Sequence, residues 1–177
     1  MPGNTSKNKG KSFEREISKY LSELYSDSFQ RVFDSGAFTG GTNQKRRATL
    51  TEGQIRSHKG DIVPPDDWKY FNCECKSYMD FPFYQLFLNV QIPLLETWIQ
   101  QLLAAEDPGD CNLLFMKFNR KGRYVMFEKK ELFYQHRDVE YSDTSNNNWI
   151  FMGFDNFFKL NSDHLKKRCR VNPPPTK

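Results

Sequence analysis

The first clear pattern along the chain is a stripe of apolar residues near its start. Within residues 11–25, large apolar side chains recur every three or four positions, so they share one face of an α-helix. These positions are Phe13, Ile17, Leu21 and Leu24. The pattern predicts an amphipathic helix with Ser12 as its N-cap. Residues 1–10 are polar and basic, and we predict that they form a disordered tail.

A short strand and a long polar stretch follow this helix. Residues 30–33 predict a strand that ends at a turn formed by Ser35 and Gly36. Residues 39–60 have no hydrophobic period and are rich in basic side chains, which predicts a mobile basic loop. A loop of this length in a compact domain is usually functional or disordered. A solvated insertion without a function is the alternative.

The next two predicted strands surround a Pro-Pro-Asp-Asp turn. An antiparallel hairpin centred on this turn would place Asp61 opposite Glu74. Successive side chains of a strand point to opposite faces of a sheet, so the second strand has two distinct faces. The core face would carry Phe71, Cys73 and Cys75, and the other face Asn72, Glu74 and Lys76. An acid and a lysine would then lie side by side on a rigid element.

The remaining periodic segments complete an α/β pattern. Residues 93–106 carry an apolar helical face behind an initial proline, which suits the first turn of a helix. Residues 112–118 are almost continuously apolar, as in a buried central strand. A tight turn leads from there to a further strand at 123–128. We therefore predict an α/β fold with a mixed central β-sheet flanked by helices.

Composition agrees with a single globular domain. The 177 residues are 37% hydrophobic and 27% charged, an ordinary balance for one folded domain. We place the core of this domain at residues 11–128 and the mobile loop within it at 39–60. Residues 129–170 are predicted as a C-terminal elaboration of the same domain, and residues 171–177 as a tail.

Charge, cysteine content and hydropathy narrow the class of protein. The net charge of +4 permits binding to nucleic acid without requiring it. The four cysteines form no Cys-x-x-Cys pair, so buried reduced thiols are favoured over a zinc site. No signal peptide and no apolar run of membrane-spanning length is visible. We therefore expect a protein of a reducing cytoplasm that has no membrane partner.

Four charged residues form a candidate catalytic group: Glu14, Asp61, Glu74 and Lys76. Two carboxylates that face each other repel unless a divalent cation lies between them. Mg²⁺ binds a few carboxylates together with waters and phosphate oxygens. A neighbouring lysine can orient or deprotonate a water that such a metal activates. These parts suit phosphodiester hydrolysis, whereas an ordinary cross-strand salt bridge is the alternative for an isolated Glu-x-Lys.

Several stretches in a fixed order carry a resemblance to a known family. They are KGKSFEREIS, RVFDSGAF, GDIV, ECKS, PLLETWIQQ and NLLFMKFNRKGRYVMF. Together they resemble the PD-(D/E)XK nuclease superfamily, and most of all its Holliday junction resolvase-like branch of archaea and phages. The resemblance covers about Lys9 to Phe127 and implies a restriction-endonuclease-like core. Gly60 stands where the family usually has a proline, and the segment after Lys129 has no recognised counterpart.

The resemblance implies a role for each residue of the site. The roles are helix acid and metal-site acid for Glu14, central metal ligand for Asp61, second ligand for Glu74, backbone-carbonyl ligand for Cys75, catalytic lysine for Lys76, and approach to the scissile phosphate for Ser35. The implied metal is Mg²⁺, with Mn²⁺ able to replace it. No nucleotide cofactor is implied.

Basic residues on both sides of the acidic group are candidates for DNA contacts. The DNA-binding candidates are Lys11, Lys45, Arg46, Arg47, Arg56 and Lys59. Further basic residues cluster at 7–11 and at 166–170, and each cluster alone could equally be solvated surface. No helix-turn-helix or zinc-finger pattern is visible. We therefore expect recognition of DNA shape and charge rather than of base sequence.

These observations predict a Mg²⁺-dependent endodeoxyribonuclease that cuts branched DNA. The most specific expectation is a Holliday junction resolvase that acts as a homodimer in a prokaryotic or phage-infected cell. One alternative is another nuclease of this fold, of restriction or repair type, that cuts duplex or flap DNA. A second is a non-catalytic DNA-binding protein. The aromatic clusters at 81–87 and 149–158 are candidates for core or for a dimer interface.

Overall fold

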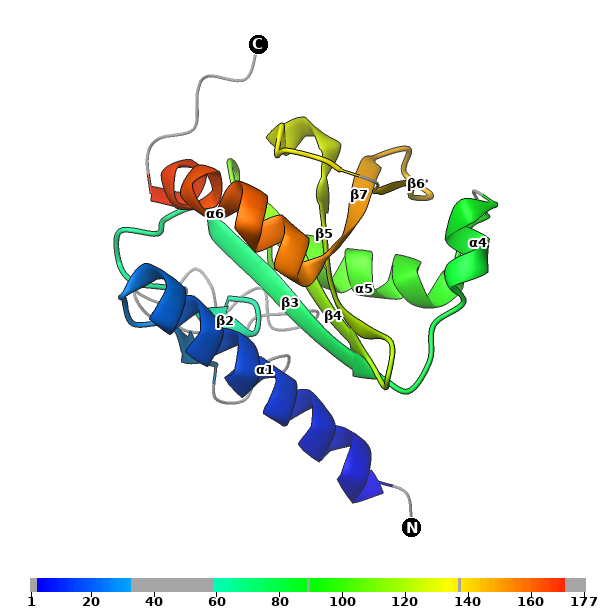
Figure 1. Ribbon diagram of the computed structural model, residues 1–177, viewed down its shortest axis with the longest axis horizontal. Coiled ribbons are helices and arrows are strands. Elements are labelled where there is room, and N and C mark those ends of the chain that lie inside the picture. Colours follow the sequence, from blue (N-terminus) through cyan, green and yellow to red (C-terminus); the bar gives the residue numbers. More distant parts are fainter. Residues whose placement is uncertain (1–2, 33–58, 89, 137, 171–177) are drawn as a thin grey trace.

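A five-stranded mixed sheet forms the centre of the protein (Figure 1). The computed structural model describes residues 3–32, 59–88, 90–136 and 138–170. In their order across the sheet, the strands are β3 (Phe71–Tyr78), β4 (Cys111–Phe118), β5 (Gly122–Glu128), β7 (Asn148–Gly153) and β6 (Val139–Ser142). β3 and β4 run parallel, and the other neighbours run antiparallel. The predicted α/β class with a mixed central sheet is therefore confirmed.

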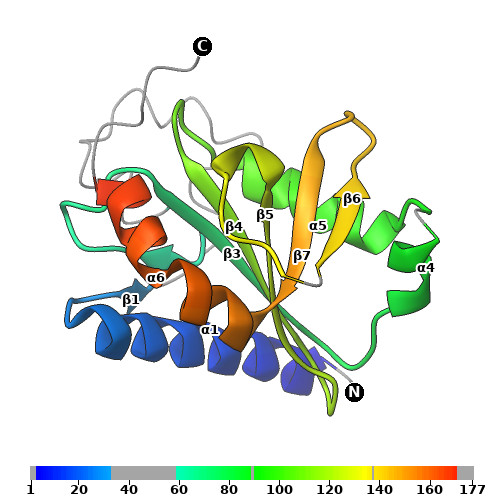
Figure 2. The ribbon, with the colours of Figure 1, turned by 45° about the horizontal axis from the view of Figure 1, so that its top comes forward.

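Helices cover both faces of this sheet (Figure 2). They are α1 (Gly3–Tyr25), α4 (Phe83–Phe87), α5 (Pro93–Ala104) and α6 (Phe154–Arg170). α1 and α6 pack on one face, whereas α5 and the short α4 lie on the other. Each face therefore has its own apolar core.

The position of β4 between two apolar cores explains why apolar and polar residues do not alternate in its sequence. Leu113 and Phe115 belong to the core under α1 and α6, and Leu114 and Met116 belong to the core under α5. All four side chains are fully buried. The prediction of a central strand from the continuous apolar run is confirmed, because a strand covered on both faces needs apolar residues at every position.

α1 is longer than its apolar stripe predicts. The stripe residues Phe13, Ile17 and Leu21 are buried, whereas Leu24 is 40% exposed. The helix begins at Gly3, so residues 3–10 are helical and were wrongly predicted as a tail. Ser12 likewise lies inside the helix rather than at its N-cap. Lysines, such as Lys9 and Lys11, have favourable helix propensity and extend a helix without needing burial.

The predicted hairpin between the segments of Asp61 and Glu74 is wrong. β2 (Ile62–Val63) instead pairs antiparallel with β1 (Gln30–Arg31) in a separate two-stranded sheet. The Pro-Pro pair directly after β2 has no amide hydrogen, so this segment cannot continue a ladder toward the turn. The Asp61 amide nevertheless donates to the Cys73 carbonyl at 3.0 Å, which keeps the segment beside β3.

The segment after β5 is an integral part of the sheet. It forms a short 3₁₀ helix, η2 (Lys129–Glu131), then β6, β7 and α6. β7 pairs with β5, and β6 forms the outer edge beyond β7. α6 buries Phe157 and Phe158 in the core that it shares with α1. This segment therefore supplies two of the five strands of the central sheet and one of the two helices on its α1 face.

All four cysteines are buried free thiols. Two of them, Cys73 and Cys75, line the core face of β3 as the strand alternation predicts. Within the described part of the chain, no helix is long and apolar enough to cross a membrane.

Candidate active site

β3 carries the centre of the site. Its buried positions Cys73 and Cys75 anchor the strand in the core, and the alternation sends Glu74 and Lys76 to the opposite face. The side chains of Glu74 and Lys76 are 16% and 15% exposed, so both are largely shielded from water. The predicted separation of Cys73 and Cys75 from Glu74 and Lys76 on opposite faces of this strand is confirmed.

Asp61 is clamped beside this strand through three hydrogen bonds. Its amide donates to the Cys73 carbonyl at 3.0 Å, and its own carbonyl accepts from the Val32 amide at 2.9 Å. Its side-chain Oδ2 accepts from the Cys75 amide at 2.7 Å. Asp61 is only 6% exposed. Its carboxylate has a fixed position next to Glu74, which lies between Cys73 and Cys75 in β3.

The geometry of β3 also directs the carbonyl of Cys75. The amide and the carbonyl of one residue in an extended strand point to the same side of that strand. Because the Cys75 amide donates to Asp61, its carbonyl also points to the side on which Asp61 lies. This orientation agrees with the predicted backbone-carbonyl ligand.

Gly60 allows this docking. Its φ of +63° lies in the left-handed region, and a Cβ added there would lie 2.4 Å from the Cys73 carbonyl oxygen. A proline, which is usual in the family at this position, needs a φ near −65°. The glycine is thus required for the close approach of Asp61 to β3.

We expect Gly60→Ala to lower the free energy of unfolding by roughly 3–4 kcal/mol, since it adds both backbone strain and a clash. Gly122→Ala is the matched control. Gly122 has a φ of +96°, but no atom lies within 4 Å of an added Cβ. The control should therefore lose only roughly 1–2 kcal/mol. Urea unfolding measures both changes, and equal losses would contradict the role of the Cys73 contact.

Lys76 is held by two oxygen acceptors. Its Nζ donates to Glu74 Oε1 at 2.5 Å and to Gln101 Oε1 at 2.6 Å. Gln101 comes from α5, which packs on this face of the sheet. Gln101 was not predicted as a site residue, because the sequence does not indicate which of the two adjacent glutamines of the helix faces β3.

Glu14 reaches the site from α1 but is itself paired. Its Oε2 accepts from Arg31 Nη1 at 2.9 Å, and both side chains are almost buried, with 11% and 13% exposed. Arg31 lies on β1 and was not predicted as a site residue. Its role depends on the pairing of β1 with β2, which places β1 next to the segment of Asp61.

The charges around Asp61 leave a local excess of negative charge. Burial raises the pKa of the Asp61 carboxyl to about 7, and the negative charges of Glu74 and Glu14 add to this rise. The Cys75 amide and the Lys76 ammonium oppose it. A bound cation would relieve this repulsion, so the residues present fit a divalent metal ion.

Oxygen donors of this kind suit Mg²⁺. Asp61 and Glu74 would supply carboxylates and Cys75 a carbonyl, and Mg²⁺ fills the rest of its coordination shell with waters and phosphate oxygens. No group of three or more Asp, Glu, His or Cys side chains in the described residues is arranged to hold a metal ion. Glu14 pairs with Arg31 here, and its place in the metal site stays a prediction.

The raised pKa of Asp61 predicts a pH-dependent stability of the metal-free protein. Between its ordinary pKa of 3.8 and about 7, the folded state binds more protons at this carboxyl than the unfolded state does. Stability therefore falls as pH rises through this window, and the loss is complete above it. Asn keeps an acceptor for the Cys75 amide but cannot ionise.

Between about pH 4 and pH 8, the free energy of unfolding should fall by ~1–3 kcal/mol less in Asp61→Asn than in the wild type. Urea unfolding in EDTA across this range measures the effect. The exposed Asp80, 73% exposed in its side chain, gives the control variant Asp80→Asn. Parallel stability–pH curves for the wild type and Asp61→Asn would show that Asp61 ionises normally.

The predicted DNA-binding residues have different environments. Ser35, Lys45, Arg46, Arg47 and Arg56 lie outside the described residues. Lys11 is exposed on α1, as a phosphate contact requires.

Lys59 has a different environment from Lys11. Its Nζ lies 3.0 Å from Asp107 Oδ2 and also contacts Asp110, and its side chain is only 8% exposed. Lys59 is therefore a buried, paired cation in this structure, and its contact with DNA stays a prediction.

The C-terminal basic cluster is also partly structural. Arg168 pairs with Glu131 at 2.5 Å, and Arg170 pairs with Asp27 at 2.8 Å. Both arginines connect α6 to other elements of the fold. Lys167 remains exposed on the same helix.

A mixed sheet flanked by helices, with an aspartate docked beside a strand that carries Glu-x-Lys, defines a restriction-endonuclease-like nuclease fold. The chain belongs to the family described as "phage putative PDDEXK endonuclease", whose sequence model matches residues 5–167. Neither a curated protein nor a solved structure matches the chain. The family match extends through most of α6, so the segment after Lys129 does have a counterpart in the family.

Proposed function

We propose that this protein is a Mg²⁺-dependent endodeoxyribonuclease that cuts branched DNA, with the four-way Holliday junction as its substrate. One observation carries the proposal. The Asp61 carboxylate is fixed by the Cys75 amide at 2.7 Å, directly beside Glu74 and the Lys76 ammonium. Membership in a family of PDDEXK endonucleases supports the same chemistry.

Each residue of the site has a distinct task in this proposal. Asp61, Glu74 and the Cys75 carbonyl hold the metal ion, which when bound stabilises negative charge on the phosphate and activates a water. Lys76 donates hydrogen bonds, and its ammonium can orient that water or a phosphate oxygen at the reaction centre. Gln101 accepts a second hydrogen bond from Lys76 at 2.6 Å, so Lys76 would keep this partner if Glu74 bound the metal ion.

Arg31 and Glu14 support this arrangement from the other side. Their ion pair at 2.9 Å joins α1 to β1, and β1 pairs with β2, which follows Asp61 directly. The Val32 amide, next to Arg31, donates to the Asp61 carbonyl. The pair therefore positions Asp61 through the backbone, and Arg31 orients the Glu14 side chain.

A non-catalytic DNA-binding protein is a weaker candidate. Burying Asp61 next to two other carboxylates raises its pKa to about 7, which is a cost to folding. A protein that only binds DNA gains nothing from this cost, and negative charge repels phosphate. The arrangement is useful where a cation is bound.

The proposal includes a symmetric homodimer in a reducing cytoplasm. Cutting two strands of one junction needs two active sites, and two-fold dimers are the commonest assembly. Exposed apolar side chains at and after α4, Tyr84, Phe87 and Leu88, support an interface there. Four buried free thiols agree with a reducing compartment.

The test is a cleavage assay on a panel of end-labelled substrates. Four-way junction, flap, duplex and single-stranded DNA of matched sequence are incubated with Mg²⁺, Mn²⁺ or EDTA. We expect symmetric cuts in the junction with either metal and none in EDTA. If plain duplex is cleaved as well as the junction, the resolvase proposal fails, and a nuclease of restriction or repair type takes its place. No cleavage of any substrate with either metal would refute the nuclease itself.

A further inference from the structure

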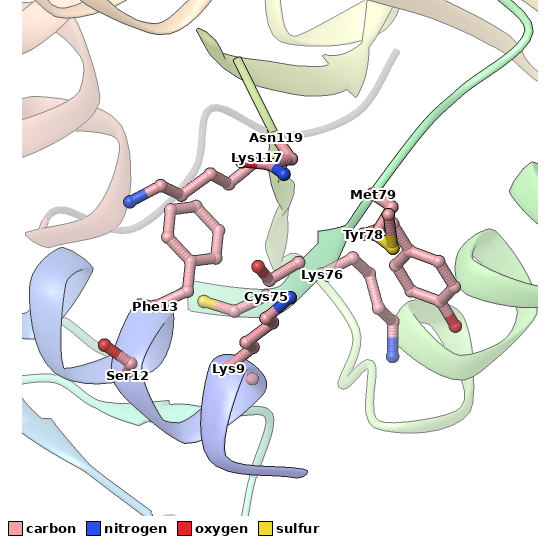
Figure 3. A pocket seen from close by; sticks show the side chains of 11 residues that line it. Lys9, Ser12, Phe13, Cys75, Lys76, Tyr78, Met79, Lys117 and Asn119 are labelled. Atoms are coloured by element: carbon pink, nitrogen blue, oxygen red, sulfur yellow. The ribbon is translucent and has the colours of Figure 1, made fainter. Parts of the chain in front are cut away.

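A hollow adjoins the proposed active site at the end of β3 (Figure 3). Its volume is about 860 Å³, and its walls come from α1, the end of β3 and the end of β4. Consecutive residues of β3 line it, including Cys75, Lys76 and Tyr78. Because successive strand residues point to opposite faces, the hollow must wrap around the outer edge of β3. It shares Cys75 and Lys76 with the site, so a strand cut there would continue into it.

Cationic side chains contribute to the walls from two elements. Lys9 of α1 is exposed, and Lys117 of β4 is 43% exposed in its side chain. Lys117 pairs with Glu16 at 2.5 Å, but Glu16 also accepts from Arg123 at 3.2 Å. A phosphate can therefore take over Lys117 while Glu16 keeps a cationic partner. Such partly exposed ion pairs are weak and exchange partners at little cost.

The other part of the hollow is apolar, which a phosphate backbone alone does not need. Phe13 forms part of the wall, and Tyr78 and Met79 lie at its opposite side, 43% and 71% exposed. The Tyr78 ring packs on Trp98 with 4.8 Å between the centroids, so its orientation is fixed from behind. Exposed aromatic side chains next to cations are the features with which proteins stack unpaired bases.

We propose that this hollow binds one unpaired nucleotide of the DNA strand next to the scissile phosphate. Lys9 and Lys117 contact its phosphates, and Tyr78 and Met79 contact its base. The hollow has the size of a small-ligand site. In a base-paired duplex the bases are stacked inside the helix, so only phosphates could reach the hollow. The inference rests on the proposed function, because it assumes that the DNA strand passes Lys76. The hollow would then select DNA with unpaired nucleotides at a branch.

The test measures binding in EDTA, so it does not require cleavage. Fluorescence anisotropy compares labelled oligo-dT with an oligomer of the same length that lacks all bases. We expect oligo-dT to bind about 5- to 50-fold more tightly, since base stacking contributes to each contact. Tyr78→Ala and Met79→Ala should remove most of this preference. Met79→Ala removes an exposed side chain, so it tests the base contact even if Tyr78→Ala disturbs folding.

Variants of another exposed tyrosine and of another exposed lysine are the matched controls. Tyr134 is 73% exposed and does not line the hollow, so Tyr134→Ala should retain the preference. Lys9→Gln should reduce the slope of log affinity against log salt by about 0.7, the value for one phosphate of a single strand. Lys19→Gln, at a 78% exposed side chain of the same helix, should leave the slope unchanged.

The possible outcomes separate the hollow from the nuclease. Equal affinity for oligo-dT and the baseless oligomer, or no binding of either, overturns the nucleotide site. The same conclusion follows if Tyr78→Ala and Met79→Ala both behave like Tyr134→Ala. If the preference holds but no substrate is cleaved with Mg²⁺ or Mn²⁺, the site stands and the proposed function falls.

Discussion

Asp61→Asn should reduce the rate of DNA cleavage at least about 10³-fold, while DNA binding stays equal or becomes tighter. The amide keeps the shape of the side chain and can still accept from the Cys75 amide. It removes one of the two carboxylates that would hold the metal ion, and it also removes a negative charge that repels phosphate. Single-turnover cleavage with Mg²⁺ and anisotropy in EDTA measure the two effects separately.

Asp80→Asn is the matched control for this variant. Asp80 follows β3 and pairs with Lys121, but its side chain is 73% exposed and outside the acidic centre. Its cleavage rate should remain within about twofold of the wild type, as for a surface substitution of small effect. If Asp61→Asn cleaves DNA at a similar rate to Asp80→Asn, the metal site lies elsewhere in the protein.

Lys76→Met should reduce the cleavage rate about 10²- to 10⁴-fold without weakening DNA binding by more than a single phosphate contact. Methionine keeps an unbranched apolar stem but loses the ammonium that Glu74 and Gln101 hold. Lys76→Arg should not restore activity, because a planar guanidinium cannot replace a point charge in this confined position. Single-turnover rates with saturating enzyme report the change.

Two glutamines of α5 supply the control for the position of Lys76. Gln101→Ala should lower the cleavage rate by less than Lys76→Met does, because the ammonium remains and loses only one hydrogen-bond partner. Gln100 is exposed on the same helix and has no contact with Lys76 among the described residues, so Gln100→Ala should behave as the wild type. A wild-type rate for Lys76→Met would contradict a catalytic lysine at this position.

Local periodicity determined much of the fold. The stripe from Phe13 to Leu21 identified α1, and the apolar run of β4 identified the central strand. The alternation along β3 separated Cys73 and Cys75 from Glu74 and Lys76. These features follow from the 3.6-residue and 2-residue repeats of helix and strand, which every chain carries in its local sequence.

The extent of α1 needed the structure, because helix propensity is a weak preference. Lysines and polar residues before the apolar stripe are compatible with a tail or with a helix, and their propensities differ only slightly from each other. The structure continues the helix to Gly3. A stripe predicts the part of a helix that packs, and it gives no boundary for the part that is exposed.

The sequence by itself therefore determined the α/β class and the elements that present Asp61, Glu74 and Lys76, the residues that we propose for the chemistry. Only the tertiary structure decided that β2 pairs with β1, that Gly60 is required at its φ of +63°, and that Gln101 faces Lys76. It also decided that Lys59 is buried and paired with acids. The reason is physical: local repeats fix the face on which a side chain lies, whereas its partner is chosen by contacts between segments far apart in the chain.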